Sequence, residues 1–268
     1  MTALLDRLRS GELCLMLAIR GSRTTDVVRI AQATGHSAIM VDLEHSVISL
    51  DLAGQLCAAA GDLGLTPFVR IPERDYGCIG RLLDSGAEGI IAPRVETVGA
   101  AELISRACRF PPRGQRSQLA MVPHLGMRPT PATSLNPALD GRTIVQALLE
   151  TPLGIQNAAA IASLDGVDML GIGANDLTAE LGAPGDYTDP RLHDAVLTAA
   201  EACREHGKPL MLGGIADLSV LGPLMDLGVS PLVMTGTDTE VLYAGAESRA
   251  ARYTAWWQDR HDRPDRSR

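Results

Sequence analysis

The sequence predicts a (β/α)8 barrel, and three observations support this fold class. Strand-like and helix-like segments alternate eight times over 268 residues, which is the pattern and length of this architecture. The strand-like segments are apolar on both faces, as in a parallel sheet that helices cover on both sides. The composition is 46% hydrophobic but only 3% aromatic, which favours an aliphatic α/β interior. No Pro- or Gly-rich linker divides the chain, so we expect one barrel domain, residues 1–257, and a disordered polar tail, residues 258–268.

Short apolar runs that end in polar or turn-forming residues define the expected strands. In chain order these are Leu13–Ile19, Ser37–Asp42, Thr66–Ile71, Gly89–Pro93, Thr143–Leu149, Asp168–Gly173, Lys208–Leu212 and Pro231–Met234. A helical segment follows each strand, and several carry end signals, such as Thr24 or Thr25 as N-cap and Gly35 or Gly86 just past the last turn. The expected helices are Thr24–Thr34, Leu50–Leu63, Tyr76–Ser85, Val98–Arg109, Pro152–Leu164, Pro190–His206 (the main part of a broken helix), Asp217–Leu227 and Asp238–Trp257.

Two features qualify this pattern. Residues 110–140 show little periodicity, and a connection of that length in a compact domain is usually functional or mobile. The alternative architecture is a doubly wound open sheet, which usually has fewer strands and a nucleotide-binding fingerprint at its first turn. The first turn here, Arg20-Gly21-Ser22-Arg23, is not that fingerprint.

Charge and cysteine usage exclude several classes of function. The net charge of −8 argues against nucleic-acid or anionic-membrane partners, which need a clustered basic face. No apolar run approaches the roughly 18 residues of a membrane span, and the first residues do not resemble a secretory signal. The five cysteines are odd in number, widely spaced and set in apolar surroundings, so we expect reduced core residues of a cytoplasmic protein.

Polar side chains gather where the expected strands end, which is where barrel enzymes place their active sites. They are Glu44 and His45 after the second strand, Arg70 in the third, Glu150 after the fifth, and Asn175 and Asp176 after the sixth. We therefore expect all six to face one mouth of the barrel.

The residue types at this mouth indicate metal-assisted chemistry. Glu150 and Asp176 offer hard oxygen ligands that suit Mg²⁺ or Mn²⁺, with Co²⁺ or Zn²⁺ tolerated. Arg70 presents a fork of donors suited to a carboxylate or an enolate oxygen. Histidine titrates nearest neutrality, so His45 is the natural proton carrier. Asp84, in the helix after the third strand, is placed in sequence so that it could fold back to orient that imidazole.

The single lysine argues against another mechanism. Lys208 stands at the amino end of the seventh strand, on the face opposite the expected site. A barrel aldolase that forms a lysine Schiff base is therefore disfavoured. Carbon–carbon chemistry would need a metal as Lewis acid to stabilise an enolate.

Several segments together resemble the HpcH/HpaI family of metal-dependent pyruvate aldolases. The resemblance runs from the first strand to about Tyr243 and rests on residues 42–45 (DLEH), 69–72 (VRIP), 83–87 (LDSGA), 92–97 (APRVET), 110–116 (FPPRGQR), 150–151 (ET), 166–168 (GVD) and 171–177 (GIGANDL). It implies a (β/α)8 barrel of the phosphoenolpyruvate/pyruvate type. It also implies a hexamer, a trimer of dimers, in which the C-terminal helix packs on a neighbour, with Tyr253, Trp256 and Trp257 as contacts.

The resemblance implies a role for each site residue. Residues matching Glu150 and Asp176 bind the divalent metal, the one matching Arg70 stabilises the enolate, and the pair matching His45 and Asp84 moves the proton. The expected substrate contacts besides Arg70 are Gly173, Ala174, Asn175, Asp176 and Leu212. Asp42, Glu44 and Gln146 are expected to support these groups by orienting waters or the strand ends.

Three departures from the family pattern concern the substrate. Leu148 stands where close relatives often carry a glutamine, while Gln146 has the same strand parity. Ser46-Val47 replaces the usual residues after Glu-His, and residues 117–137 match the family least. The acceptor specificity therefore stays open.

We expect a cytoplasmic class II aldolase that reversibly cleaves a 4-hydroxy-2-keto acid to an aldehyde and pyruvate, or an analogue such as hydroxypyruvate. One alternative is oxaloacetate decarboxylation or malyl/citramalyl-CoA-type lyase chemistry on the same scaffold. The lyase would need Arg113, Arg116 and Arg128 for the CoA phosphates. Another alternative is a non-catalytic oligomeric protein that binds a carbohydrate or keto acid, for which the intact acid, arginine and histidine set would be hard to explain.

Overall fold

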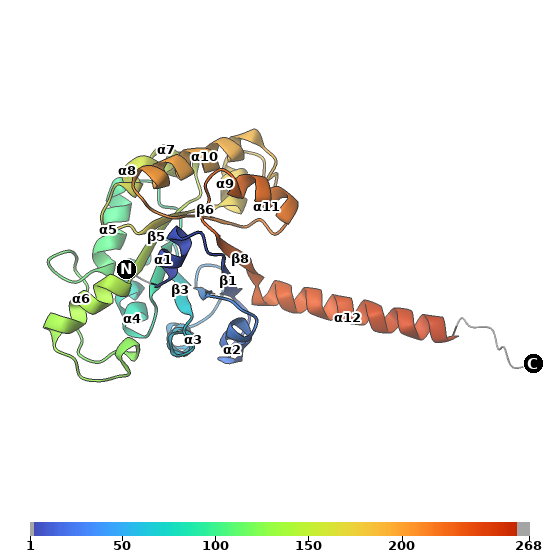
Figure 1. Cartoon of the computed structure of the whole chain (residues 1–268), viewed down its shortest axis with the longest axis horizontal. Helices are drawn as coiled ribbons and strands as arrows, with labels where there is room; N and C mark the ends of the chain where they lie inside the picture. The colour runs from blue at the N-terminus through green and yellow to red at the C-terminus, as the bar shows by residue number, and fades with distance from the viewer. Residues whose placement is uncertain (1–2, 262–268) are drawn as a thin grey trace, which may run out of the picture.

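In a computed structural model that describes residues 3–261, eight parallel strands form a nearly closed barrel with helices around it (Figure 1). The predicted (β/α)8 fold is confirmed. The strands are β1 Cys14–Ile19, β2 Ala38–Asp42, β3 Thr66–Arg70, β4 Gly89–Ala92, β5 Ile144–Leu149, β6 Met169–Gly173, β7 Leu210–Gly213 and β8 Leu232–Thr237. Their order is β7-β6-β5-β4-β3-β2-β1-β8, so sequential strands are neighbours and β1 also pairs with β8.

Helices connect the strands and cover the outside of the barrel. They are α1 Ala3–Arg9, α2 Asp26–Ala33, α3 Leu50–Asp62, α4 Ile79–Asp84, α5 Val98–Cys108, α6 Ala132–Arg142, α7 Pro152–Gln156, α8 Ala158–Ala162, α9 Ala174–Glu180, α10 Pro190–Glu205, α11 Leu218–Met225 and α12 Asp238–His261, with 3-10 turns η1 Tyr76–Cys78 and η2 Pro123–Leu125. Local side-chain caps fix several starts: the hydroxyls of Ser49, Thr97 and Thr151 each accept the backbone N–H of the third residue of α3, α5 and α7, respectively.

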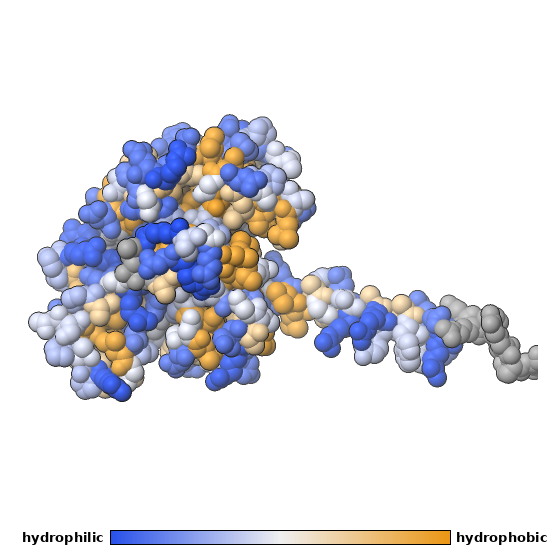
Figure 2. All heavy atoms as spheres, in the orientation of Figure 1, coloured by the Kyte–Doolittle hydropathy of each residue, from blue (hydrophilic) through white to orange (hydrophobic). Residues whose placement is uncertain are grey.

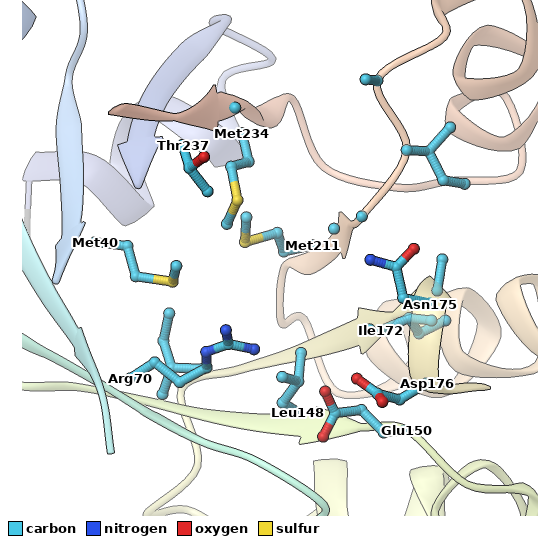
Figure 3. A pocket seen from close by; sticks show the side chains of 18 of the residues that line it. Met40, Arg70, Leu148, Glu150, Ile172, Asn175, Asp176, Met211, Met234 and Thr237 are labelled. Atoms are coloured by element: carbon cyan, nitrogen blue, oxygen red, sulfur yellow. The ribbon is translucent and has the colours of Figure 1, made fainter. Parts of the chain in front are cut away.

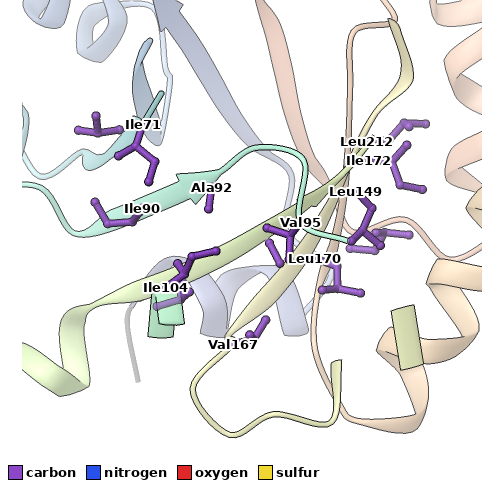
Figure 4. Close-up of a cluster of buried hydrophobic side chains, with 14 of the residues drawn as sticks. Ile71, Ile90, Ala92, Val95, Ile104, Leu149, Val167, Leu170, Ile172 and Leu212 are labelled. Atoms are coloured by element: carbon purple, nitrogen blue, oxygen red, sulfur yellow. The ribbon is translucent and has the colours of Figure 1, made fainter. Parts of the chain in front are cut away.

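The core has two layers because alternate residues of each strand face opposite ways. On β5, Val145, Ala147 and Leu149 face the helices, where they join a large apolar cluster (Figure 4). Ile144 and Leu148 face the barrel interior with a second cluster. Gln146 has the same parity and is buried there too. The inward parity of β5 continues from Gln146 and Leu148 to Glu150, so this buried strand delivers one carboxylate to the mouth.

The structure adds two helices that the sequence pattern did not predict. α1 buries Leu4, Leu5 and Leu8 against the start of β1 at the amino end of the barrel. α6 lies within the stretch that we expected to be irregular, and it contains Pro137 and Gly141. Only Leu135 and Leu139, one turn apart, are buried on α6, so its apolar periodicity is too short to recognise.

The C-terminal helix also differs from expectation. α12 continues to His261, so the tail prediction is wrong for residues 258–261, while residues 262–268 lie outside the described part. The helix extends away from the barrel and none of its residues is buried (Figure 1). Between residues 3 and 261, no helix combines the length and apolarity needed to cross a membrane.

Candidate active site

A cavity of about 170 Å³ opens at the carboxyl ends of the strands. Inward-facing residues of five strands give it an apolar lining: Met40, Ile91, Leu148, Met211 and Met234. Its rim carries Arg20, Arg70, Glu150, Asn175 and Asp176. Figure 3 shows the carboxylates of Glu150 and Asp176 next to each other, with the Arg70 guanidinium facing them from the other side of the cavity. The predicted mouth residues Arg70, Glu150, Asn175 and Asp176 therefore line one cavity.

Glu150 follows β5 and is almost fully buried, with 3% of its surface exposed. One carboxylate oxygen accepts the backbone N–H of Arg94 at 2.8 Å. Burial raises the pKa of Glu150 to about 7, against the opposing effect of that hydrogen bond, and the charges of Glu44 and Asp176 add to the rise. The next strand approaches closely, because a Cβ on Gly173 would lie 2.5 Å from Glu150 Oε1. Glycine at position 173 therefore leaves room for this carboxylate.

This donor set fits a divalent cation that keeps most of its coordination for other ligands. Glu150 and Asp176 supply oxygen donors, and the burial that penalises the charge of Glu150 would favour a bound cation. Within residues 3–261 no group of three or more His, Cys, Asp or Glu side chains is arranged to hold a metal. Two protein carboxylates would leave positions for water and a chelating substrate, as the residue types predict.

Arg70 is held in place by Asp42, its partner in the register between β2 and β3. Arg70 Nε donates to Asp42 Oδ1 at 3.0 Å and Nη2 donates to Oδ2 at 2.6 Å. Burial alone would raise the pKa of Asp42, but the hydrogen bonds and charge of Arg70, and then Arg20, lower it to about 2. Asp42 Oδ1 also accepts the backbone N–H groups of Glu44 and His45. Asp42 therefore orients both the guanidinium and the loop that follows β2.

Glu44 lies between Arg70 and His45. Its Oε2 is 3.2 Å from Arg70 Nη1 and 3.9 Å from His45 Nε2. Burial raises the pKa of Glu44, although the Arg70 charge opposes this. Within residues 3–261, Oε2 is buried without a hydrogen-bond donor in suitable geometry. The shorter contact that Oε2 makes is the ion pair with Arg70, and a supporting role of Glu44 stays a prediction.

His45 and Asp84 are not brought together within the chain. The His45 side chain is 53% exposed beside Glu44. Asp84 ends α4 and accepts a hydrogen bond of 2.8 Å from Arg116 Nη2. A helix after a barrel strand runs back toward the amino ends, so its last residue lies at the opposite end from the loop after β2. The expected fold-back onto His45 therefore does not form, and Glu44 is the acid nearest the imidazole.

The loop after β6 lies at the mouth of the barrel, as expected from the sequence. Gly173 precedes α9, and Ala174, Asn175 and Asp176 form its first turn, with all four residues lining the cavity. Asn175 is also fixed from outside, since its Oδ1 accepts a hydrogen bond from the Tyr187 hydroxyl. Free N–H groups at a helix start favour an anion such as a substrate carboxylate.

Two other predicted positions differ in outcome. Leu212 does not line the cavity: it packs among the helices, as Figure 4 shows, while Met211 and Gly213 on either side line the site. The strand alternation that we used for β5 excludes Leu212 from the mouth. Gln146 does line the cavity, 1% exposed, and its Oε1 has no partner within residues 3–261.

Sequence reasoning missed Arg20 and Glu240, which also line the cavity. Arg20 directly follows β1, so the rule applied to the other strand ends identifies it once it is applied to this strand. Glu240 belongs to a capping box with Thr237, in which Thr237 N donates to Glu240 Oε2 at 2.7 Å and Glu240 N donates to Thr237 Oγ1 at 3.2 Å. The spacing Thr-x-x-Glu at the start of a helix is the signal for it.

The acids, arginines and histidine lie at the carboxyl ends of the strands, which is where enzymes with a (β/α)8 barrel have their active sites. Residues 16–216 match the family described as HpcH/HpaI aldolase/citrate lyase, and the chain belongs to this family. The chain is 38% identical over 214 residues to a 4-hydroxy-4-methyl-2-oxoglutarate aldolase of Hapsidospora irregularis, which covers 79% of each protein. It is 32% identical over 251 residues to a hydroxypyruvate/pyruvate aldolase of Pseudomonas aeruginosa, which covers 92% of this chain and 91% of that protein.

Solved structures support the fold. An HpcH/HpaI aldolase from Desulfitobacterium hafniense DCB-2 has a TM-score of 0.84 at 23% identity, covering 99% of this chain and 98% of that one. Together with the curated relatives, the family match identifies the chain as an enzyme of the aldolase/lyase class.

Proposed function

We propose that this protein is a divalent-metal-dependent class II aldolase that reversibly cleaves a 4-hydroxy-2-keto acid to pyruvate, or an analogue such as hydroxypyruvate, and a carbonyl acceptor. The observation that carries the proposal is the buried Glu150 beside Asp176, facing an arginine that Asp42 holds in place. The relatives named above are aldolases of such oxo acids.

Each side chain at the mouth has a role in this reaction. Glu150 and Asp176 would hold Mg²⁺, Mn²⁺ or Co²⁺, with Zn²⁺ also compatible, and the bound ion supplies Lewis-acid polarisation of the keto oxygen. Arg70 meets negative charge on the same oxygen as the donor half becomes an enolate. The first turn of α9 faces the donor carboxylate. His45, with Glu44 beside it, moves the proton of the substrate hydroxyl.

Metal removal tests this proposal directly. Protein treated with EDTA should release no pyruvate from a panel of 4-hydroxy-2-keto acids, and Mg²⁺, Mn²⁺ or Co²⁺ should restore the release. Glu150→Ala and Asp176→Ala should each abolish the metal-restored activity. Near-normal turnover after chelation, or in either variant, would refute the metal site.

The site does not favour the acyl-CoA lyase alternative. Of the three arginines considered for the CoA phosphates, Arg116 is 4% exposed, bonded to Asp84 and stacked 4.6 Å from the Phe110 ring centroid. The guanidinium of Arg116 is therefore already engaged in contacts inside the protein. Oxaloacetate decarboxylation would use the same carboxylates and Arg70, so oxaloacetate belongs in the assay panel.

We further propose a cytoplasmic homo-oligomer, a hexamer, in which α12 packs on a neighbouring subunit. Six large apolar residues of α12 are more than half exposed: Val241, Leu242, Tyr243, Tyr253, Trp256 and Trp257. Figure 2 shows hydrophobic surface in orange where α12 leaves the barrel. The five free, buried cysteines suit a reducing compartment. Asp84 and His45 do not pair within one chain, so their pairing stays a prediction that requires the two residues to come from different subunits.

A further inference from the structure

The mouth of the barrel holds two arginines in different states. Arg70 is the buried one: its side chain is 10% exposed and its Nε and two Nη atoms face Asp42 and Glu44. Arg20 has a side chain that is 35% exposed and uses only Nε, which donates to Asp42 Oδ2 at 2.5 Å. Within residues 3–261, its two terminal nitrogens make no hydrogen bond. Arg20 is thus the cation at this cavity with donors to spare for an incoming anion.

The loop that carries Arg20 is fixed before any ligand arrives. The Asp238 carboxylate, at the start of α12, accepts the backbone N–H groups of Arg20 at 2.9 Å, Gly21 at 3.1 Å and Ser22 at 2.6 Å. A Cβ on Gly21 would lie 2.5 Å from Thr239 Cγ2, so glycine at this position lets the loop approach α12 closely. Asp42 holds the guanidinium from the other side. A donor group positioned in this way loses little entropy on binding.

The strand order places Arg20 across the mouth from the metal-binding carboxylates. Arg20 follows β1 and Glu150 follows β5, which are four strands apart around the barrel in either direction. A substrate whose keto-acid end lies at Glu150, Asp176 and the first turn of α9 therefore points its other end toward β1. The group that Arg20 meets belongs to the acceptor half, beyond the bond that breaks.

We propose that Arg20 binds a carboxylate on the acceptor half of the substrate, so that the preferred substrates are 4-hydroxy-2-oxo dicarboxylic acids. An arginine with two free nitrogens on one edge is a bidentate carboxylate receptor. This inference rests on the proposed aldolase function and adds the class of acceptor, which is an oxo acid.

The cleavage step balances without any further reactant. The C3–C4 bond breaks, the C4 hydroxyl gives up its proton, and its oxygen becomes the carbonyl of the departing oxo acid. The bonding pair passes to the donor half as an enolate, which takes a proton at C3 and leaves as pyruvate. Arg20 touches the acceptor carboxylate throughout and takes no part in these proton movements.

A matched pair of substrates tests the proposal. 4-Hydroxy-2-oxopentanedioate and 4-hydroxy-2-oxopentanoate have the same carbon chain, with a carboxylate or a methyl group at the acceptor end. The wild-type enzyme, loaded with the metal that gives most activity, should show a kcat/KM about tenfold or more higher for the dicarboxylate. Arg20→Met should reduce the ratio of the two kcat/KM values by about 10- to 100-fold, and Arg20→Lys should retain part of it.

The control is Arg29→Met on the exposed face of α2, which removes the same charge away from the cavity and should keep the wild-type ratio. A wild-type enzyme with no preference between the two substrates would overturn the assignment. So would an Arg20→Met variant in which kcat/KM falls equally for both substrates, because Arg20 would then act only by holding Asp42 in place. If Arg20→Met does not fold, the wild-type preference and Arg20→Lys decide the matter. Wild-type protein that cleaves neither substrate with any metal would instead refute the aldolase function itself.

Discussion

Arg70 acts on the reaction through a geometry that Asp42 determines. Both are the last residues of neighbouring strands, and a bidentate pair between them leaves the guanidinium little freedom. Such a preorganised charge contributes most where negative charge develops in the transition state.

Arg70→Ala should therefore lower kcat by about 100-fold or more, the scale of loss when a transition-state charge partner is removed. Steady-state kinetics of pyruvate release, with saturating metal, measures this. If only KM rose while kcat stayed near wild type, Arg70 would be a ground-state binding residue and the enolate role would be wrong.

Glu150 makes the stability of the metal-free protein depend on pH. Its pKa is raised from 4.5 to about 7, so below pH 4.5 the folded and unfolded chains both carry the proton and this stabilising contribution is fully present. As the pH rises from 4.5 through 7, the unfolded chain loses the proton first and the contribution is lost, a change on the order of 3 kcal/mol.

Glu150→Gln removes this titration while keeping the shape of the side chain. In the absence of metal the variant should gain stability relative to wild type as the pH rises from 5 to 8, by an amount on the order of 3 kcal/mol. Urea unfolding in EDTA at the two pH values gives the difference. A constant difference between the proteins would show that Glu150 ionises normally.

At the residue scale, the strand-end rule predicted where Glu150, Asp176 and Arg70 lie, because it depends only on chain direction. It did not predict their partners. The Asp42–Arg70 pair depends on the register between two strands, which the local sequence does not encode. Within this chain Asp84 pairs with Arg116 instead of His45, because the helix after a barrel strand runs back toward the amino ends, and the pairing of Asp84 with His45 stays a prediction.

At the scale of elements, the start of α12 joins two parts of the mouth. Asp238 accepts the three N–H groups of the Arg20 loop, while Thr237 and Glu240 form the capping box beside it. The strand-end loop after β1 and the last helix therefore stabilise each other.

Asp238→Ala should leave those three N–H groups without their acceptor and cost about 1–3 kcal/mol of unfolding free energy. Hydrogen exchange should speed up at the amides of Arg20, Gly21 and Ser22. Ser219→Ala, which removes a hydroxyl bonded only within the start of α11, is the control and should leave exchange at these amides unchanged. Unaltered exchange in Asp238→Ala would mean that the loop is held by other contacts.

Elements with strong periodicity were predicted within a few residues, since apolar strands and amphipathic helices carry their own signal. α1 and α6 were missed because each buries only two or three leucines, and Pro137 argued against a helix. Their burial against the barrel, rather than local propensity, determines that they form.

At the scale of the whole molecule, α12 is a helix of 24 residues that contacts β1 and β8, and its residues from Thr239 to His261 are all exposed. At about 100° per residue, Leu242, Tyr253, Trp256 and Trp257 lie within roughly 100° of one another, on a face that also carries Arg249 and Arg260. An exposed face of this kind on a helix that leaves its own domain is typical of an intersubunit contact.

The double variant Trp256→Asp/Trp257→Asp should therefore dissociate the oligomer, because it places two charges in the middle of a surface that must lose its water. Light scattering during size-exclusion chromatography should give a wild-type mass six times that of the 28.3 kDa chain and a smaller mass for the variant. Ala251→Asp introduces one such charge on the opposite side of α12 and should keep the wild-type mass, which separates a face-specific effect from a general one. A wild-type protein that is monomeric at micromolar concentration would show that α12 has another partner. A double variant that keeps the full mass would show that the subunits associate through the barrel instead.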